Sequence, residues 1–302
     1  MKFAELLKKV FVDEYWACGI RRLESEEAFL LTDDAAVHRY EPVYAGRQYW
    51  CADPFLVRHE GRTYLFLERM RKGCKKAVIG LAEIQEGRAG DVRPIIQAGH
   101  HLSYPAVFEH KGVFYMLPES RPQKTLTLWR ALSFPDQWEQ CALLLENREV
   151  ADVTPYWDGK GWNLLIYEPD DASNRRTLYT APLDPETGVL GPLEKRVAYK
   201  EKVGRPAGFP IRIGSRMILP TQIGVRQYGE AISYRELIIN GSAFAERECA
   251  RFTPDSVRMR GYRRILGIHT INRLDDLEVI DVCYQRFAPL RMFRRLLGRL
   301  GG

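Results

Sequence analysis

Five carboxylates occupy matching places in the chain and have the chemistry for acid–base catalysis. Asp53 and Asp152 come shortly before segments that read as strands, and Glu68, Glu119 and Glu168 each close a second strand-like segment. Two carboxylates that face each other across a cleft can act on a glycosidic bond, one as acid and the other as base or nucleophile. We therefore predict Asp53, Glu119, Asp152 and Glu168 as candidate catalytic residues.

Some of these residues also have a purely structural interpretation. Glu68 and Glu168 could instead accept hydrogen bonds from backbone N–H groups of a turn. Asp53 precedes a proline and could cap the start of a strand. His269 lies in an otherwise apolar run, so it could be either a site residue or a hydrogen-bonded core residue. The residue types alone leave these alternatives open.

Side chains suited to bind a sugar recur near the same places. Aromatic rings can stack on sugar rings, and arginine can donate hydrogen bonds to hydroxyls or bind a phosphate or carboxylate. We predict these substrate-binding residues: Trp50, Tyr104, Arg205, Gln222, Arg226, Tyr228 and His269. We also expect residues 222–229 to form a polar loop rather than a packed strand.

A repeat of about fifty residues positions these side chains. Pro54, Pro105, Pro155 and Pro206 are 51, 50 and 51 residues apart, and each opens a strand, a tight turn and a second strand. A weaker fifth copy covers residues 267–281. This period is typical of a β-propeller, and proline is tolerated where a strand begins. We predict an all-β, five-bladed β-propeller whose strand starts ring one axial cavity.

The flanks of the repeat define the predicted domain organisation. Residues 15–21 read as an extra strand that should pair with the last blade and close the ring. We therefore place the propeller at residues 15–287. An N-terminal amphipathic segment, with a short helix over residues 3–12, occupies residues 1–14, and a basic amphipathic tail occupies residues 288–302.

The composition is that of a globular protein with a local excess of positive charge. Hydrophobic residues make up 45% of the 302 residues, and no apolar run approaches the roughly 20 residues of a membrane span. The net charge of +6 is concentrated near the C-terminus, which argues against nucleic acid as a partner. We identify no signal peptide, and six scattered cysteines form no C-x-x-C pair. We expect a cytoplasmic protein without a metal or other cofactor.

The tail itself suggests a possible partner. Its apolar residues Leu290, Phe293, Leu297 and Leu300 have helical spacing. The arginines between and before them are Arg286, Arg291, Arg294, Arg295 and Arg299. Such a helix could lie on an anionic membrane surface at the inner face of the membrane, or pack on the propeller with solvated arginines.

Several motifs together resemble a known family. They are Ala52-Asp53-Pro54-Phe55-Leu56, Tyr104-Pro105, Leu117-Pro118-Glu119-Ser120, Arg205-Pro206-Ala207-Gly208, Gln222 with Arg226-Gln227-Tyr228-Gly229, and Gly267-Ile268-His269-Thr270. Over residues 16–287 the chain resembles the N-terminal domain of plant glucosamine inositolphosphorylceramide transferases and its stand-alone bacterial relatives. That domain is similar to the five-bladed arabinanase, levansucrase and invertase superfamily, which includes family 43 glycoside hydrolases.

The resemblance implies roles for some residues and a departure at another. In family 43 the first-blade aspartate before proline is the general base, which corresponds to Asp53, and a third-blade aspartate that tunes the acid corresponds to Asp152. The general acid is a glutamate that starts the fourth blade, where this chain has Gly204-Arg205-Pro206 and no carboxylate. Ordinary hydrolysis would therefore need Glu119 or Glu168 as a substitute acid.

Three functions remain open at this point. The protein could bind a sugar and act in glycan or glycolipid biosynthesis, associated with glycosyl transfer. It could be a family-43-like glycosidase that uses Asp53 with Glu119 or Glu168. It could also be a non-catalytic sugar-binding scaffold, so the sequence does not decide whether the chain is an enzyme. No glycine-rich phosphate loop or dinucleotide-binding fingerprint is present in the sequence.

Overall fold

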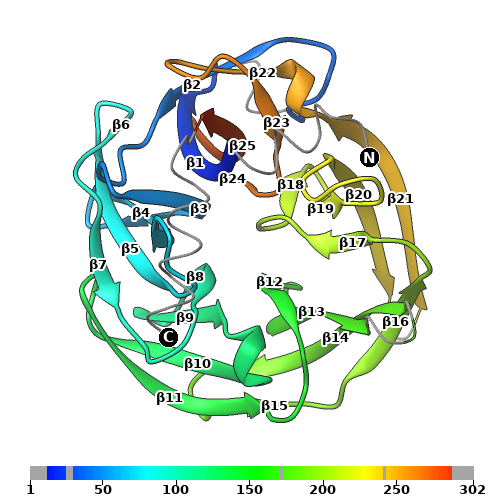
Figure 1. Ribbon diagram of the computed structural model, residues 1–302. Coiled ribbons are helices and arrows are strands. Elements are labelled where there is room, and N and C mark those ends of the chain that lie inside the picture. Colours follow the sequence, from blue (N-terminus) through cyan, green and yellow to red (C-terminus); the bar gives the residue numbers. More distant parts are fainter. Residues whose placement is uncertain (1–11, 25–29, 171–172, 174, 241–242, 288–302) are drawn as a thin grey trace.

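The computed structural model describes residues 12–24, 30–170, 173, 175–240 and 243–287. Five β-sheets are arranged around a central axis as the blades of a propeller (Figure 1). This arrangement confirms the predicted fold. Residues 3–11 of the predicted N-terminal helix and the predicted helix of the 288–302 tail lie outside the described residues, and Val12, the last residue of the first prediction, begins strand β1 instead. Within those residues, no helix has the length and apolarity that crossing a membrane requires.

The first four blades follow one another along the chain. Blade 1 contains β3 (Tyr49–His59), β4 (Arg62–Arg71), β5 (Ala77–Gln85), β6 (Arg88–Ala89) and β7 (Arg93–Ile96). Blade 2 contains β8 (Ser103–His110), β9 (Val113–Glu119), β10 (Leu126–Ser133) and β11 (Gln137–Leu145), with the short helix η2 (Arg121–Gln123). Blade 3 contains β12 (Ala151–Trp157), β13 (Trp162–Asp170), β14 (Arg175–Asp184), β15 (Val189–Leu190) and β16 (Glu194–Tyr199). Blade 4 contains β17 (Val203–Pro206), β18 (Ile211–Ile213), β19 (Arg216–Ile223), β20 (Ala231–Asn240) and β21 (Ala243–Phe252).

The fifth blade joins the two ends of the chain. It contains β23 (Ile265–Gly267), β24 (Ile271–Leu274), β25 (Leu277–Phe287), β1 (Val12–Arg22), β2 (His38–Pro42) and β22 (Val257–Met259), with η3 (Pro254–Ser256) before β22. Strand β1 pairs antiparallel with β25 along its whole length, from Val12 opposite Phe287 to Arg22 opposite Leu277. The predicted closing strand is therefore confirmed, and it extends beyond residues 15–21 at both ends.

Apolar side chains fill the spaces between neighbouring blades. Five hydrophobic clusters are present, and each joins one blade to the next around the ring. Phe55 and Phe66 of blade 1, for example, pack with Tyr104 and Met116 of blade 2. Because apolar faces are buried blade against blade, the polar residues on the innermost strands are left to gather around the axis.

A bulge in the inner strand of each of the first four blades sets which residues reach the axis. The pairing shifts at this point, and the bulged residue has a left-handed backbone: φ is 50° at Asp53, 46° at Tyr104, 47° at Asp152 and 79° at Gly204. A bulge bends the strand and re-aims its side chain. The four inner strands therefore begin with the same local backbone geometry.

The bulges also correct the alignment of the third blade. Ala52 pairs with Glu68 and Ser103 with Glu119, whereas Ala151 pairs with Tyr167. Asp152, rather than Thr154 beside the proline, is thus the equivalent of Asp53, and Tyr167 rather than Glu168 is the equivalent of the two glutamates. The proline spacing misled the alignment because Pro155 lies two residues further into its strand than Pro54 does.

Candidate functional site

Arg205 lies at the centre of the polar residues near the axis. Its guanidinium donates to both carboxylate oxygens of Asp152, from Nε at 2.6 Å and from Nη2 at 2.8 Å, and from Nη2 to Glu119 at 2.9 Å. Gln222 Nε2 donates to the same Asp152 carboxylate at 2.6 Å, and the Asp152 backbone N–H donates to Glu119 at 3.0 Å. The structure therefore brings together four of the predicted site residues from blades 2, 3 and 4.

Electrostatics favour the charged form of Arg205. Burial acts against the guanidinium charge, but the Asp152 and Glu119 carboxylates outweigh it and raise the pKa of Arg205 well above its ordinary value. A guanidinium held by two carboxylates in a low-dielectric site is fixed in place. Asp152 is 1% exposed and Gln222 4%, while the Arg205 side chain retains 21% exposure. Arg205 is thus the most exposed member of this group, followed by Glu119 with a side chain 10% exposed.

Asp53 and His269 form the second half of the cluster, on blades 1 and 5. Asp53 Oδ1 accepts a hydrogen bond from Thr270 Oγ1 at 2.8 Å and lies 3.2 Å from His269 Nε2. Asp53 Oδ2 accepts the Tyr104 backbone N–H at 3.1 Å. Asp281 anchors both neighbours, since its carboxylate accepts the backbone N–H groups of Asp53, His269 and Thr270 at 2.9–3.0 Å.

The charges of this half-cluster reinforce one another. Burial acts against the charge of His269, but Asp281 and Asp53 outweigh it and raise the pKa of His269 well above its ordinary value. Burial likewise opposes ionisation of Asp53, but the His269 charge and the hydrogen bonds from His269 and Thr270 lower its pKa. At neutral pH, Asp53 is therefore a carboxylate beside an imidazolium. We call Asp53, Glu119, Asp152, Arg205, Gln222, His269 and Asp281 the axial cluster.

Asp53, His269 and Asp281 also have the donor atoms of a metal site. Their ligand atoms lie within 4.8 Å of one another, and all three residues are buried. His269 Nδ1 lies 2.8 Å from Asp281 Oδ1 but makes no well-aligned hydrogen bond to any described residue. However, the carboxylates already accept hydrogen bonds from backbone N–H groups and Thr270, which satisfies them without an ion.

Glu68 is a carboxyl group of a different kind, within electrostatic reach of both half-clusters. It is 6% exposed, and His101 Nε2 lies 3.5 Å from its Oε1. Burial raises the pKa of Glu68 well above its ordinary value, and the charges of Asp53 and Glu119 add to this effect while His269 opposes it. Burial also raises the pKa of Asp152, but Asp152 is paired with Arg205, whereas Glu68 has no guanidinium partner among the described residues. Glu68 is thus a carboxyl group of the site suited to hold a proton.

An aromatic group covers His269 at the edge of the cluster. The Trp16 ring lies 4.1 Å from the His269 ring and 5.6 Å from Tyr228, whose ring lies 5.1 Å from His269. Tyr228 is 53% exposed, and its phenol is within electrostatic reach of Arg205 and Asp53. An exposed aromatic ring beside hydrogen-bonding groups is what a sugar-binding site needs. Trp16 was missed from the sequence because only closure of the ring by β1 brings it here.

Other predicted site residues lie elsewhere. Tyr104 is fully buried, and its hydroxyl contacts Thr154 Oγ1 and the Gly208 N–H, each at 2.8 Å, so it ties three blades together. Glu168 makes a two-point ion pair with Arg148, at 2.8 and 2.6 Å, and no hydrogen bond joins it to the axial cluster. Its side chain is on the opposite face from that of Tyr167 because side chains alternate along a strand.

Three further predictions concern blades 1 and 4. Trp50 is half-buried in β3, opposite Met70. Arg226 pairs with Glu230, Nε to Oε1 at 2.7 Å, and its side chain is 82% exposed, away from the cluster. The polar loop predicted for residues 222–229 begins later than expected, because Gln222 and Ile223 are buried at the end of β19.

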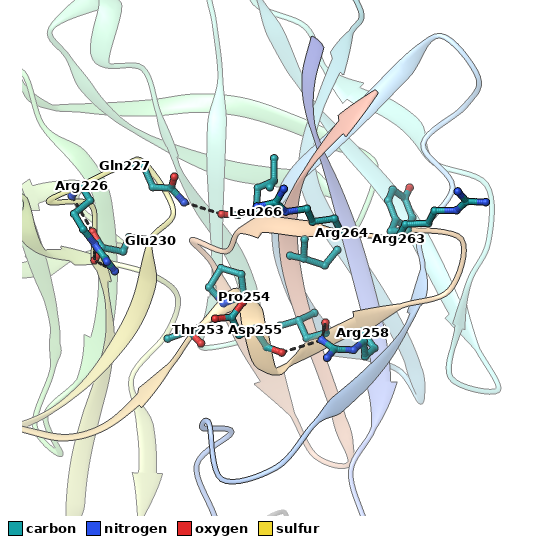
Figure 2. A pocket seen from close by; sticks show the side chains of 13 residues that line it. Arg226, Gln227, Glu230, Thr253, Pro254, Asp255, Arg258, Arg263, Arg264 and Leu266 are labelled. Atoms are coloured by element: carbon teal, nitrogen blue, oxygen red, sulfur yellow. Dashed lines mark hydrogen bonds and ion pairs between the residues drawn. The ribbon is translucent and has the colours of Figure 1, made fainter. Parts of the chain in front are cut away.

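Two cavities flank the axial cluster. One, of about 850 Å³, lies between the 226–230 loop of blade 4 and residues 253–258 and 262–266 of blade 5, and we call it the arginine groove (Figure 2). The other, of about 380 Å³, lies at the far ends of the inner strands, where Tyr156, Trp157 and Phe209 contribute to a mainly apolar lining. Residues of all five blades line this second cavity, which opens at the opposite end of the axis from the bulges.

Comparison with known sequences confirms the family resemblance for the first half of the propeller. Residues 43–178 match the family described as "Glucosamine inositolphosphorylceramide transferase 1, N-terminal". The chain is 32% identical over 113 residues to the protein of that name from Oryza sativa subsp. indica, and 34% identical over 113 residues to that from Arabidopsis thaliana. The match covers 37% of this chain but spans only 15% of the length of either plant protein.

Solved structures with the same fold include carbohydrate-active enzymes. A thermostable family-43 glycoside hydrolase has a TM-score of 0.55 at 12% identity, covering 80% of this chain and 91% of its own. A β-1,2-mannobiose phosphorylase from Listeria innocua has a TM-score of 0.55 at 10% identity, covering 92% and 99%. At these identities the similarity establishes the five-bladed fold.

Proposed function

We propose that this protein binds a sugar over the axial cluster and serves glycan or glycolipid assembly. The observation that carries the proposal is the joint placement of Arg205, His269 and the exposed Tyr228 ring at one end of the axis. Fixed charged donors and an aromatic face are the two elements of sugar recognition. The plant relatives, which are named as glucosamine inositolphosphorylceramide transferases, support assembly rather than degradation.

The same contacts argue against hydrolysis by the family-43 route. Arg205 occupies the start of the fourth blade, where that route needs a proton donor, and it holds Asp152 and Glu119 in ion pairs. Asp152 accepts Arg205 on both carboxylate oxygens, and Glu119 Oε2 already accepts hydrogen bonds from Arg205 Nη2 and from the Asp152 backbone N–H. Glu119 is therefore unsuited to be the substitute acid, and Glu168 lies outside the cluster.

One observation favours glycosidic-bond cleavage as a second candidate function. Glu68 has a raised pKa and lies within electrostatic reach of Asp53, whose pKa is lowered. Two carboxyl groups with pKa values moved apart are suited to act as acid and base. In this alternative Glu68 would donate the proton and Asp53 would be the base.

Binding and turnover of a panel of monosaccharides, oligosaccharides and sugar nucleotides would test both functions. We expect binding to wild type by isothermal titration calorimetry, weakened about tenfold in Tyr228→Ala, or about 1.4 kcal/mol. Trp157→Ala is the matched control, since Trp157 is a 42% exposed aromatic residue at the opposite end of the axis. Equal losses in the two variants, or no binding to wild type, would contradict sugar recognition over the axial cluster.

Product analysis distinguishes the two candidates. Binding without product supports recognition alone. A product that disappears in both Asp53→Asn and Glu68→Gln, while sugar binding persists, would establish the second candidate instead.

A further inference from the structure

The arginine groove has an uncompensated positive charge. Four arginines and two carboxylates line it, and only one of those arginines, Arg226, is paired with a carboxylate of the groove, Glu230. Arg258 donates from Nη1 to the backbone carbonyls of Asp255 and Val257, both at 2.8 Å. Arg263 and Arg264 have neither a hydrogen bond nor an ion pair with any residue in the described part of the chain.

These cations come from separate segments that enclose one space. Arg226 lies on the loop before β20, Arg258 on β22 and Arg264 just before β23, and Figure 2 shows them around the groove. A hydrogen bond from Gln227 Nε2 to the Leu266 carbonyl, at 2.8 Å, joins two of the walls. Solvated arginines on a convex surface need no ligand, but arginines that converge on a concave space of about 850 Å³ form an anion-binding geometry.

The inner end of the groove meets the axial cluster. Gln227 lines the groove, and the next residue, Tyr228, contacts His269 with a ring separation of 5.1 Å. Leu266 lines it as well, and Ile268 two residues later donates its N–H to the Gly229 carbonyl at 2.9 Å. A ligand with its sugar on Tyr228 would therefore extend an anionic substituent into the groove.

We infer that the arginine groove binds the phosphate or diphosphate of a phosphate-linked sugar whose glycosyl unit lies over the axial cluster. This inference rests on the proposed sugar recognition and names its substrate class. Phosphate suits these arginines, because a guanidinium donates to it through two parallel N–H groups and a diphosphate has enough oxygens to engage more than one of them. The phosphate could be part of a nucleoside diphosphate or of a lipid headgroup, which share this chemistry.

The groove can be tested without a sugar. Inorganic diphosphate should bind wild type in calorimetry, and Arg264→Gln should weaken this binding about tenfold. Arg62→Gln is the control, because it removes the same charge from a side chain that is 66% exposed in blade 1. No diphosphate binding to wild type, or equal losses in both variants, would overturn the inference even if neutral sugars bind.

A comparison of sugar phosphates with inorganic phosphate tests whether the arginine groove and the axial cluster bind one ligand. Hexose 1-phosphates should bind more tightly than inorganic phosphate, and Tyr228→Ala should abolish that difference while leaving diphosphate affinity unchanged. If wild type binds hexose 1-phosphates no more tightly than inorganic phosphate, the groove is not part of a sugar site. If neutral sugars fail to bind but diphosphate binding depends on Arg264, the proposed function fails while the anion site stands.

Two further arms distinguish the sources of the phosphate. Uridine diphosphate that binds more tightly than inorganic diphosphate, with loss in Arg264→Gln, indicates a nucleotide-linked sugar. Flotation with vesicles that contain phosphatidic acid, reduced by Arg264→Gln and by added inorganic diphosphate, indicates a lipid-linked one. Vesicle binding that neither Arg264→Gln nor added inorganic diphosphate reduces would contradict a lipid phosphate in the groove.

Discussion

Glu68 is the residue whose environment differs most from that of its neighbours. Asp53, Glu119 and Asp152 each receive hydrogen bonds from charged or backbone donors, whereas the Glu68 side chain makes no hydrogen bond with any described residue and has His101 Nε2 at 3.5 Å. A buried carboxyl without a donor is more stable in its protonated form. Its folded-state pKa is therefore raised above the unfolded value, and the stability that it contributes is present at acidic pH and lost as the pH rises through the folded value.

This difference predicts an effect of pH on stability. Glu68→Gln should make the free energy of unfolding less dependent on pH above about 4.5, because the substitution removes the group that must ionise. The wild type should lose up to about 1.4 kcal/mol per pH unit relative to the variant until Glu68 has ionised. Urea denaturation of both proteins between pH 4.5 and 8 would measure this difference in the free energy of unfolding. The whole range lies above the unfolded-state pKa of about 4.3, where the unfolded chain has already ionised.

Glu60→Gln is the matched control for Glu68, because its side chain is 82% exposed. Glu60→Gln should leave the pH dependence of the free energy of unfolding the same as in wild type. Parallel curves for Glu68→Gln and wild type would contradict a raised pKa at Glu68.

Much of the axial cluster could be predicted from residue types within the repeat. Asp53, Glu119, Asp152, Arg205, Gln222 and His269 were chosen for their places near strand starts and strand ends, and these places converge. Asp281 was missed because it belongs to the fifth copy of the repeat, where the spacing is irregular. Tyr104 was misjudged because a residue type does not reveal whether a bulge turns its ring towards solvent or between blades.

At the scale of elements, closure of the ring depends on a buried ionic network around Glu278. This residue of β25 is fully buried, and its carboxylate contacts Arg21 Nε of β1 at 2.8 Å and Arg273 Nε of β24 at 2.6 Å. It also accepts hydrogen bonds from Thr32 at 2.5 Å and from the Tyr40 hydroxyl of β2 at 2.6 Å. Burial opposes its ionisation, but Arg273 and Arg21 outweigh it and lower the pKa of Glu278.

Removing this carboxylate should weaken the closing blade. Glu278→Ala leaves two buried guanidinium groups without their anion, which typically costs about 3–5 kcal/mol of unfolding free energy. Chemical denaturation followed by tryptophan fluorescence would measure the loss. Asp276→Ala is the control, because it breaks the Arg22–Asp276 ion pair between β1 and the turn that precedes β25, with side chains 60% and 50% exposed.

Asp276→Ala should lower the free energy of unfolding by at most about 1 kcal/mol, since exposed ion pairs contribute little to stability. Similar losses in the two variants would show that the network does not hold β1 in place.

The elements were predictable to different degrees. Regular proline spacing and glycine turns defined the inner hairpins of four blades, because each unit carries its own local signals. The parallel pairing of β2 with β22 was not predicted, since it joins residues 38–40 to residues 257–259 and no local pattern encodes so distant a contact. The register of blade 3 was misjudged for a similar reason, because a bulge is defined by the partner strand.

At the scale of the whole molecule, closure brings the two flanks of the propeller together. Val12 and Phe287 pair directly, so the segments before and after the described propeller depart from one point on the ring. The sequence places basic residues in both segments, with Lys8 and Lys9 on one side and four arginines in residues 288–302, next to Arg286 of β25, on the other. We propose that these segments form one basic patch that contacts an anionic membrane surface at its cytoplasmic face.

Flotation with vesicles tests this membrane contact separately from the arginine groove. The full chain should float with vesicles that contain about a quarter phosphatidylserine, because each basic residue near such a surface contributes about 1 kcal/mol. A chain that ends at Arg286 should stay in the dense fractions, and high salt should release the full chain. The Arg264→Gln protein should float like wild type if the tail carries the contact. Equal flotation of the full and shortened chains would instead assign membrane affinity to the propeller, and a reduction by Arg264→Gln would then place that contact at the arginine groove.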